Sequence, residues 1–366
     1  MRNKKLWVAG ALLAGAAAYL VTYPAFGKRV SRTEKKRYDE LPHYTDGKFR
    51  NTPPIVSPGG LETLQSLAKD FFVGKADLHP ANPMPTEKFI REIGLKTPHV
   101  TWFGHSCVLV EWEDKVLLVD PMFGKVPLPF PIKNMRYPSE EALDLNDLPV
   151  IDWVVYSHDH YDHLDYDTVQ TIKDRVRKFI VPLGVGKRLE GWGVPTHRIF
   201  ELDWWESYQD DGIRFHAASA RHFSGRLGID YAETLWCSWV FEWDNYRIFY
   251  SGDSGYGQHF EEIGRRYGPF DLVLMECGQY DERWPGVHMH PNESMKAFFD
   301  TGGAHLMPIH WGAFTLAFHT WDDPPEQMMH LGEEHQVHVV IPKIGEKLDV
   351  AKLDDYETTS WWKPVI

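Results

Sequence analysis

The chain has 366 residues, of which 43% are hydrophobic and 25% charged, so it is long enough to bury the core of one large α/β domain. Its formal net charge is -13, yet residues 1–37 carry nine Lys and Arg against a single acid, Glu34. So acidic a body excludes nucleic acid as the main partner, whereas the basic arm suits an anionic membrane surface.

The N-terminal segment has the first clear pattern. Residues 6–23 carry no charge, have basic residues on both sides and end at Pro24. This pattern predicts a membrane anchor and a membrane-associated protein, with the side of the membrane left open. A cleaved signal peptide is the alternative, because Ala25 and Gly27 are small residues where a signal peptidase could cut, and the chain would then be exported.

Three regions follow: residues 1–27 as anchor or signal, 28–60 as basic arm and Pro-rich linker, and 61–366 as the main domain. In the domain, short apolar runs bounded by turn residues predict strands over residues 100–103, 107–112, 116–119, 153–156, 179–181, 213–217, 235–243, 246–250, 272–275 and 305–309. Helical patterns cover residues 61–72, 86–93, 164–175, 260–267, 291–299 and 324–330. The alternation predicts an α/β fold in which two packed sheets carry helices on their outer faces.

Four potential metal ligands lie in the six residues 158–163, just after the apolar run 151–156, namely His158, His160, Asp162 and His163. Alternate side chains of an extended segment point the same way, so His158 and His160 can bind one cation. Asp162 and His163, beyond the bend, point at a second. Nitrogen and oxygen donors without thiolate suit zinc, and also manganese or iron. A solvated His-rich loop is the alternative, which this order of ligands at a strand end disfavours.

A two-metal site needs more donors, and each of three candidates directly follows another apolar run. His222 could complete the first set, and the carboxylate of Asp253 could bridge both cations. His310 could join Asp162 and His163 on the second. Side chains on loops at the ends of rigid strands are well placed for such a site.

In this order the seven residues match the pattern H-x-H-x-D-H followed by a distant His, Asp and His, and the chain resembles the metallo-β-lactamase superfamily. Within it, the chain is similar to the branch of N-acylphosphatidylethanolamine-hydrolysing phospholipases D, at residues 102–107, 201–206, 235–239, 251–256, 268–271 and 309–312. The resemblance implies a four-layer αββα sandwich of two mixed sheets and two Zn²⁺, with Mn²⁺ or Fe²⁺ as alternatives. It also implies a phospholipid substrate, hydrolysed to phosphatidic acid and an N-acylethanolamine.

Two cations a few ångströms apart would lower the pKa of a water between them and stabilise a leaving alkoxide, so no side-chain nucleophile is needed. Asp253 would then be a catalytic residue as well as a ligand. The resemblance gives His288, in the sequence HMHP, the role of acid or phosphate binder; a cap on the helix that begins near Pro291 is the alternative. His290 is the lesser candidate. His105 could orient a ligand or satisfy a strand-end hydrogen bond.

The sequence departs from the branch at residues 276–280, where ECGQY stands in place of a typical PIGAY, and an acid there could change the charge of the pocket. Two other functions stay open: a metal-dependent lactonase acting on a soluble sugar phosphate, and a non-catalytic, membrane-anchored binding protein. A small pocket lined with Arg or Lys would favour the lactonase, and a wide apolar groove would disfavour it. A homodimer is possible.

Overall fold

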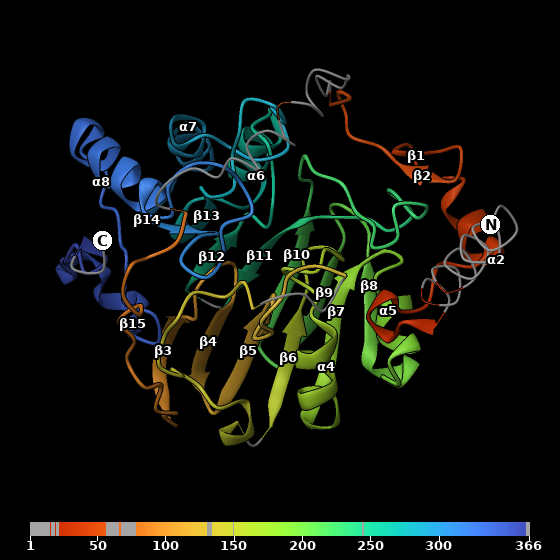
Figure 1. The fold of residues 1–366 in the computed structure, drawn as a ribbon, viewed down its shortest axis with the longest axis horizontal. Helices are drawn as coiled ribbons and strands as arrows, with labels where there is room; N and C mark the ends of the chain where they lie inside the picture. Colours follow the sequence, from red (N-terminus) through yellow and green to blue (C-terminus); the bar gives the residue numbers. More distant parts are fainter. Residues whose placement is uncertain are drawn as a thin grey trace, which may run out of the picture.

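The computed structural model describes residues 15, 19, 22–55, 66, 78–129, 134–148, 150–243 and 245–363. Two mixed sheets form its centre (Figure 1). The first sheet has seven strands, in the order β15 (Lys347–Asp349), β3 (Leu95–Trp102), β4 (Val108–Glu113), β5 (Lys115–Val119), β6 (Ile151–Val155), β7 (Val176–Pro182) and β8 (Ile199–Leu202). The second has six, in the order β14 (Gly303–Ile309), β13 (Phe270–Glu276), β12 (Arg247–Tyr250), β11 (Ser238–Glu242), β10 (Ile213–Ala218) and β9 (Ser207–Asp210).

Helices lie outside the sheets, with α4 in front of the first sheet in Figure 1 and α6 and α7 near β12 and β13. The helices of the described part are α2 (Arg32–Tyr38), α4 (Tyr166–Ile172), α5 (Gly186–Gly191), α6 (His259–Tyr267), α7 (Pro291–Thr301) and α8 (Asp323–His335). Short 3₁₀ turns occur at Pro24–Phe26, Leu145–Asp147, Lys173–Arg175, Thr196–Arg198 and Val350–Asp355. The predicted four-layer αββα sandwich is confirmed.

The central strands are covered on both faces, which explains why they read as continuous apolar runs rather than alternating ones. Every residue of β6 is buried, and so is every residue of β4 before its last. Trp153 of β6 and Trp239 of β11 are almost fully buried between the layers. The Trp239 indole also donates to the Tyr156 carbonyl at 3.0 Å, which joins the second sheet to the end of β6.

Each predicted strand overlaps an observed strand, because its short apolar run is buried in one of the two sheets. The predicted helix over residues 86–93 is wrong, since the described backbone there is not helical. Glu87 N donates to Ile344 O at 2.7 Å and Phe89 N to Ala142 O at 2.8 Å, so contacts with distant segments replace the helical bonds. The predicted helix over residues 61–72 lies outside the described residues, apart from Ser66.

The predicted membrane-associated localisation through residues 6–23 is corrected. None of the helices in the described part of the chain has the length and apolar character needed to cross a bilayer. Of residues 6–23, the structure describes only Gly15, Tyr19, Thr22 and Tyr23.

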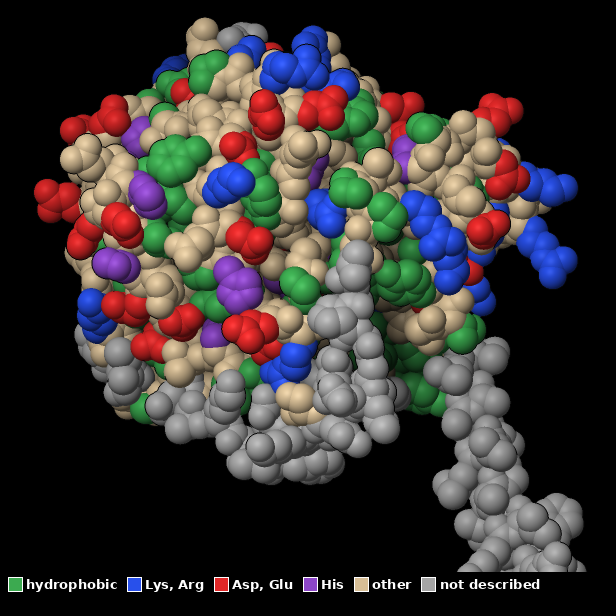
Figure 2. Space-filling model, turned by 90° about the horizontal axis from the view of Figure 1, so that it is seen from above, with side chains coloured by type: hydrophobic (Ala, Val, Ile, Leu, Met, Phe, Trp, Pro, Cys, Tyr) green, Lys and Arg blue, Asp and Glu red, His purple; other side chains and the backbone are tan. Residues whose placement is uncertain are grey.

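The basic arm packs against the domain and carries a small hairpin of β1 (Tyr44–Thr45) and β2 (Lys48–Phe49). It forms the lobe at the right of Figures 1 and 2, where Figure 2 shows Lys and Arg gathered at the surface. Buried arginines hold the chain just before the arm, because Arg226 Nε donates to Ala25 O at 2.7 Å and Arg188 Nη1 to Phe26 O at 3.1 Å.

Arg188 is also the centre of a buried ion cluster, with its guanidinium 3.0 Å from Asp159 and 2.5 Å from Asp230. Burial alone would raise the pKa of Asp159, but the charges of Arg188, His160 and Arg226 lower it below its usual value. The carboxylate is therefore ionised and depends on its partner. Through Arg188 and through Gly225 N, which donates to Asp159 Oδ1 at 2.7 Å, Asp159 supports the loop that carries His158 and His160.

Removing the cation of this cluster tests its contribution to stability. Arg188→Leu should lower the free energy of unfolding by about 3–5 kcal/mol, because it leaves two buried carboxylates unpaired. Denaturant unfolding measures the change, and Arg265→Leu, which removes an exposed surface cation, should cost about 1 kcal/mol or less. Equal losses in the two variants would contradict a structural role for the cluster.

Candidate metal centre

The predicted ligands gather at one end of the sandwich, where the parallel strands of both sheets end. β5 and β6 are parallel, as are β12, β13 and β14. Asp120 follows β5, His158 follows β6, Asp253 follows β12 and His310 follows β14. Ligands of open α/β sheets bind at the carboxyl ends of parallel strands, and here two such edges face each other.

One set of donors contains the predicted first-metal ligands. His160 Nδ1 lies 2.8 Å from His158 Nε2 and 3.1 Å from His222 Nε2. The carboxylate Oδ2 of Asp253 lies 3.7 Å from the Nε2 atoms of both His158 and His222. Three imidazole nitrogens and one carboxylate oxygen thus converge on one point, which fits tetrahedral binding of a divalent cation.

The second set adjoins the first and contains Asp162, His163 and His310, joined by His105. Asp162 Oδ2 lies 3.5 Å from His163 Nε2 and 3.4 Å from His310 Nε2. His105 Nε2 lies 2.9 Å from the same oxygen. Burial lowers the pKa of His105 to about 3, so its neutral ring donates to Asp162 and orients that carboxylate, one of the two roles expected for it.

Asp253 connects the two sets, as expected for a bridging carboxylate. Its Oδ2 lies 3.1 Å from His163 Nε2, while Oδ1 is buried and makes no hydrogen bond to a described residue. The preceding Gly252 has a φ of 58°, and a side chain there would press on Ser157 and the Cys237 carbonyl at 2.9 Å. Glycine therefore lets the end of β12 approach the end of β6 closely enough to place Asp253 between both sets.

In three of the histidines, the ring nitrogen that points away from the centre makes a hydrogen bond, so the other nitrogen is free to bind a metal. His158 Nδ1 bonds to Ser157 Oγ at 2.9 Å, His163 Nδ1 to Asp120 Oδ2 at 2.7 Å and His222 Nδ1 to Val287 O at 3.2 Å. Each ring then presents Nε2 to the centre. Outer partners of this kind fix the tautomer and orientation of metal-binding histidines.

Asp120 is an organising residue that the sequence analysis missed. It is fully buried and accepts hydrogen bonds from Ser157 N, Ser157 Oγ, His163 Nδ1 and Tyr250 Oη. These donors come from both sheets. The signal was present, since Asp120 follows its apolar strand as His158, Asp253 and His310 follow theirs.

Asn51 is a second missed residue and lies in the predicted linker. Its side-chain amide donates to His222 O at 2.7 Å and accepts from His222 N at 3.2 Å. The arm therefore holds the backbone of a candidate ligand that is 171 residues away in the sequence.

The charges of the centre favour cation binding. Burial would raise the pKa values of Asp162 and Asp253, but the charge of His163 lowers both well below the usual range. Burial lowers the pKa values of His158 and His222, so these rings are neutral and offer lone pairs. Burial would also lower the pKa of His310, but Asp253, Asp162 and Glu276 raise it to about 9. These carboxylates stabilise a proton on His310, and a bound metal would release that proton.

His288 lies beside both sets. Its ring centroid is 5.1 Å from that of His222 and 5.0 Å from that of His310. The cap of α7 is the neighbouring His290, whose N–H is bonded to Glu293 Oε2 at 3.1 Å, so capping does not explain His288.

Ser254 is buried, and its hydroxyl bonds to His259 and the Gly255 carbonyl.

A cavity of about 450 Å³ opens onto the second set and His288. Apart from Asp162, His288, His310 and Gln279, its described lining consists of aromatic and aliphatic residues, namely Ile55, Phe223, Tyr231, Trp284, Val287 and Leu316. No Lys or Arg is among these described lining residues.

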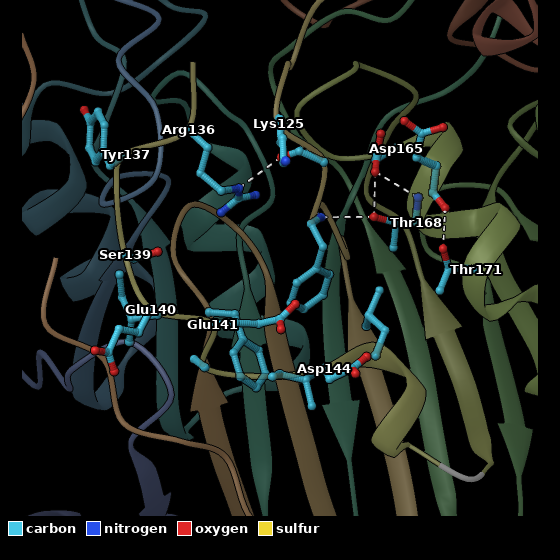
Figure 3. A pocket seen from close by; sticks show the side chains of 18 of the residues that line it. Lys125, Arg136, Tyr137, Ser139, Glu140, Glu141, Asp144, Asp165, Thr168 and Thr171 are labelled. Atoms are coloured by element: carbon cyan, nitrogen blue, oxygen red, sulfur yellow. Dashed lines mark hydrogen bonds between the residues drawn. The ribbon is translucent and has the colours of Figure 1, made fainter. Parts of the chain in front are cut away.

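A separate cavity of about 500 Å³ lies between residues 123–125, 134–146 and α4 (Figure 3). Lys125 and Arg136 line it together with Glu141 and Asp144. Arg136 already donates to the carbonyls of Gly124 and Met122, and Asp165 caps α4 through Thr168. None of the seven predicted ligands lines this cavity.

Comparisons with known proteins agree with the fold. A family model described as the beta-lactamase superfamily domain matches residues 115–311, from β5 to just beyond His310. The chain belongs to the metallo-β-lactamase superfamily. The αββα fold and the His and Asp cluster are those of a metal-dependent hydrolase in this superfamily.

Two relatives extend the likeness. A protein of Mycobacterium tuberculosis is 38% identical over 331 residues, which are 89% of this chain and 88% of the relative. The N-acyl-phosphatidylethanolamine-hydrolyzing phospholipase D 1 of Caenorhabditis elegans is 32% identical over 250 residues, which are 65% of this chain and 69% of that enzyme. The predicted resemblance to this branch of the metallo-β-lactamase superfamily is confirmed.

The fold is also that of Igni18, a metallo hydrolase from Ignicoccus hospitalis. The two structures superpose with a TM-score of 0.53 over 69% of this chain and 97% of that one, at 19% sequence identity.

Asp120 offers a test of the centre without any substrate. Asp120→Asn should weaken metal binding about 10- to 100-fold, because the amide cannot accept from all four donors and His163 loses its carboxylate partner. Competition with a chromophoric chelator measures the affinity. Asp152→Asn, which changes a buried aspartate of β6 bonded to Val116 N and Arg177, is the matched control. Unchanged affinity in Asp120→Asn would contradict the role of Asp120.

Proposed function

We propose that this protein is a dinuclear, zinc-dependent phosphodiesterase of the phospholipase D type. Its substrates are N-acylphosphatidylethanolamine-like phospholipids, which it hydrolyses to phosphatidic acid and an N-acylethanolamine. The observation that carries the proposal is the apolar cavity that opens directly onto Asp162, His288 and His310. The name of the relative from Caenorhabditis elegans supports the same substrate class.

The lining of the cavity suits a lipid. Phe223 and Tyr231 stack with ring centroids 5.6 Å apart and form one apolar wall. Trp284, Val287 and Leu316 also line the cavity. Acyl chains gain free energy from such surfaces at about 25 cal/mol per Å² of apolar area removed from water.

The same lining disfavours a sugar-phosphate lactonase. A free phosphate group needs cationic partners, and the described residues that line the cavity include none besides histidine. Lys125 and Arg136 line the separate cavity of Figure 3 instead. A phosphodiester carries one negative charge, which two cations can balance without arginine.

The donor sets support two metals. Three imidazoles and Asp253 suit zinc in the first set, and the second adds Asp162, His163 and His310. Manganese or iron also accept such nitrogen and oxygen donors. Two bound cations would lower the pKa of a water and stabilise charge on the phosphoryl oxygens. Asp253 would hold the two sets together in that reaction.

His288 is the proposed proton donor. Hydrolysis forms a bond from water oxygen to phosphorus and breaks the bond from phosphorus to the N-acylethanolamine oxygen. The water loses a proton and the leaving oxygen gains one, so His288 would accept the proton from water and pass it on to the leaving oxygen. His288 lines the cavity beside His222 and His310, where a proton can reach the leaving oxygen.

Lipid hydrolysis by metal-replete protein tests the function. In mixed micelles, the full-length protein should release phosphatidic acid and N-acylethanolamine in equal amounts, and chelator should abolish both. Mass spectrometry measures the products, with a sugar-phosphate lactone as the competing substrate. Lactone hydrolysis without lipid hydrolysis, by protein with about two bound metals, would refute the proposal.

The role of His288 has its own test. His288→Ala should lower kcat about 100-fold or more and keep the metal content of the wild type, because a general acid contributes about 10²- to 10⁴-fold. His330→Ala, at an exposed position on α8, is the control and should leave both values unchanged. Turnover of His288→Ala at the wild-type rate would exclude His288 as the acid.

A further inference from the structure

A buried carboxylate links the candidate acid to the metal centre. Glu276 is the last residue of β13, is 0% exposed and lies between His288 and His310. Its Oε1 accepts from Met289 N at 2.9 Å and is 3.4 Å from His288 Nδ1. Its Oε2 is 3.3 Å from His310 Nδ1.

From this geometry we infer that Glu276 is a positioning residue, which accepts the Nδ1 protons of His310 and His288 and so holds both rings in one tautomer. The part that concerns His288 rests on the proposed phosphodiesterase function. The part that concerns His310 needs only the metal centre.

For His310 the carboxylate decides which nitrogen faces the second set. His310 Nδ1 is equally distant, at 3.3 Å, from Glu276 Oε2 and from Asp253 Oδ1. A proton on Nδ1 that is held by Glu276 leaves the lone pair on Nε2, which lies 3.4 Å from Asp162 Oδ2. Without Glu276, Nδ1 could turn to Asp253, and Nε2 would no longer be defined as the ligand atom.

For His288, the Glu276 carboxylate offers a hydrogen-bond acceptor 3.4 Å from the ring nitrogen Nδ1. His288 Nδ1 is buried and makes no hydrogen bond to a described residue. An N–H directed at Glu276 would turn the Nε2 lone pair towards the cavity, where it can accept the water proton that is then passed to the leaving oxygen. A carboxylate that orients a histidine in this way keeps the ring in the tautomer that transfers protons.

The backbone around Glu276 is fixed, so its carboxylate has little freedom to move. Glu276 N donates to Ser251 Oγ at 2.9 Å, and Glu276 O accepts from Ser294 Oγ at 2.7 Å. Three residues further on, Gln279 donates to His310 O at 3.3 Å and to Phe314 O at 3.0 Å. Gln279 thus holds the His310 backbone, while Glu276 faces the His310 ring.

The two positions, 276 and 279, are among those where this sequence departs from the PIGAY pattern, which has no side-chain acceptor at either place. The inferred role therefore belongs to this chain and its contacts. It predicts that the second metal set is more sensitive to Glu276 than the first.

Histidine tautomers can be read directly in the wild-type protein. With ¹⁵N-labelled histidine and zinc bound, long-range ¹H–¹⁵N correlation should show His310 and His288 protonated at Nδ1, with assignment from His310→Ala and His288→Ala. A proton on Nε2 of His310, with Nδ1 unprotonated, would overturn the inference. This reading uses no substrate and no variant of Glu276.

Metal titration then tests the consequence. Zinc competition with a chromophoric chelator should show Glu276→Gln weakening one of two binding steps about 10- to 100-fold, the same step that His310→Ala removes. The other step should stay at its wild-type affinity. Glu111→Gln, which changes another buried glutamate, on β4 and paired with Lys347, should leave both steps unchanged. Glu276→Asp should restore part of the loss because it keeps the charge.

Turnover at saturating zinc tests the link between Glu276 and His288, because weaker zinc binding through His310 no longer limits the rate. With N-acylphosphatidylethanolamine micelles, in which the leaving alkoxide needs a proton, Glu276→Gln should lower kcat more than it changes KM. In the His288→Ala background the same substitution should have little further effect, because it acts through the missing ring. Additive losses in the double variant would overturn the link to His288.

The inference and the proposed function fail in different ways. Protein that hydrolyses no phospholipid but shows the tautomers and the selective loss of one zinc step would refute the substrate and keep the role of Glu276 at His310. Protein that hydrolyses the lipid while Glu276→Gln matches Glu111→Gln in both zinc steps and kcat would refute the role of Glu276.

Discussion

The hydrogen bonds to the Asp120 carboxylate are the constraint on which the centre depends. They join the end of β5, the loop after β6 and the end of β12, which belong to two different sheets. Because this carboxylate is buried, each of its donors must stay in place to satisfy it. The position of His163, and through it the spacing of both donor sets, follows from this one group.

The centre also has an electrostatic constraint. Asp120, Asp162, Asp253 and Glu276 are buried within one small region, and histidines surround them. Buried carboxylates are costly unless a positive charge or hydrogen-bond donors compensate them. Protons on His163 and His310 supply part of that charge, and divalent cations would supply more of it without the geometry changing. The same arrangement that makes the site electrostatically demanding therefore makes it selective for cations.

The sequence predicted the sandwich and the seven clustered residues because both depend on strands that read clearly. His158, Asp253 and His310 each follow an apolar run, and parallel strands bring such positions to one edge. Other features depend on contacts that no local pattern contains. Asn51 meets His222 across 171 residues, and Tyr250 meets Asp120 across 130 residues. The helix predicted over residues 86–93 failed for the same reason, since contacts with residues 142 and 344 decide that backbone.

Anomalous diffraction from crystals of the full-length protein grown with zinc tests the central claim most directly. Two zinc peaks about 3.5–4 Å apart are expected, with Asp253 between them, His158, His160 and His222 on one and Asp162, His163 and His310 on the other. A single peak, or zinc bound away from these residues, would contradict a dinuclear centre at the junction of the two sheets.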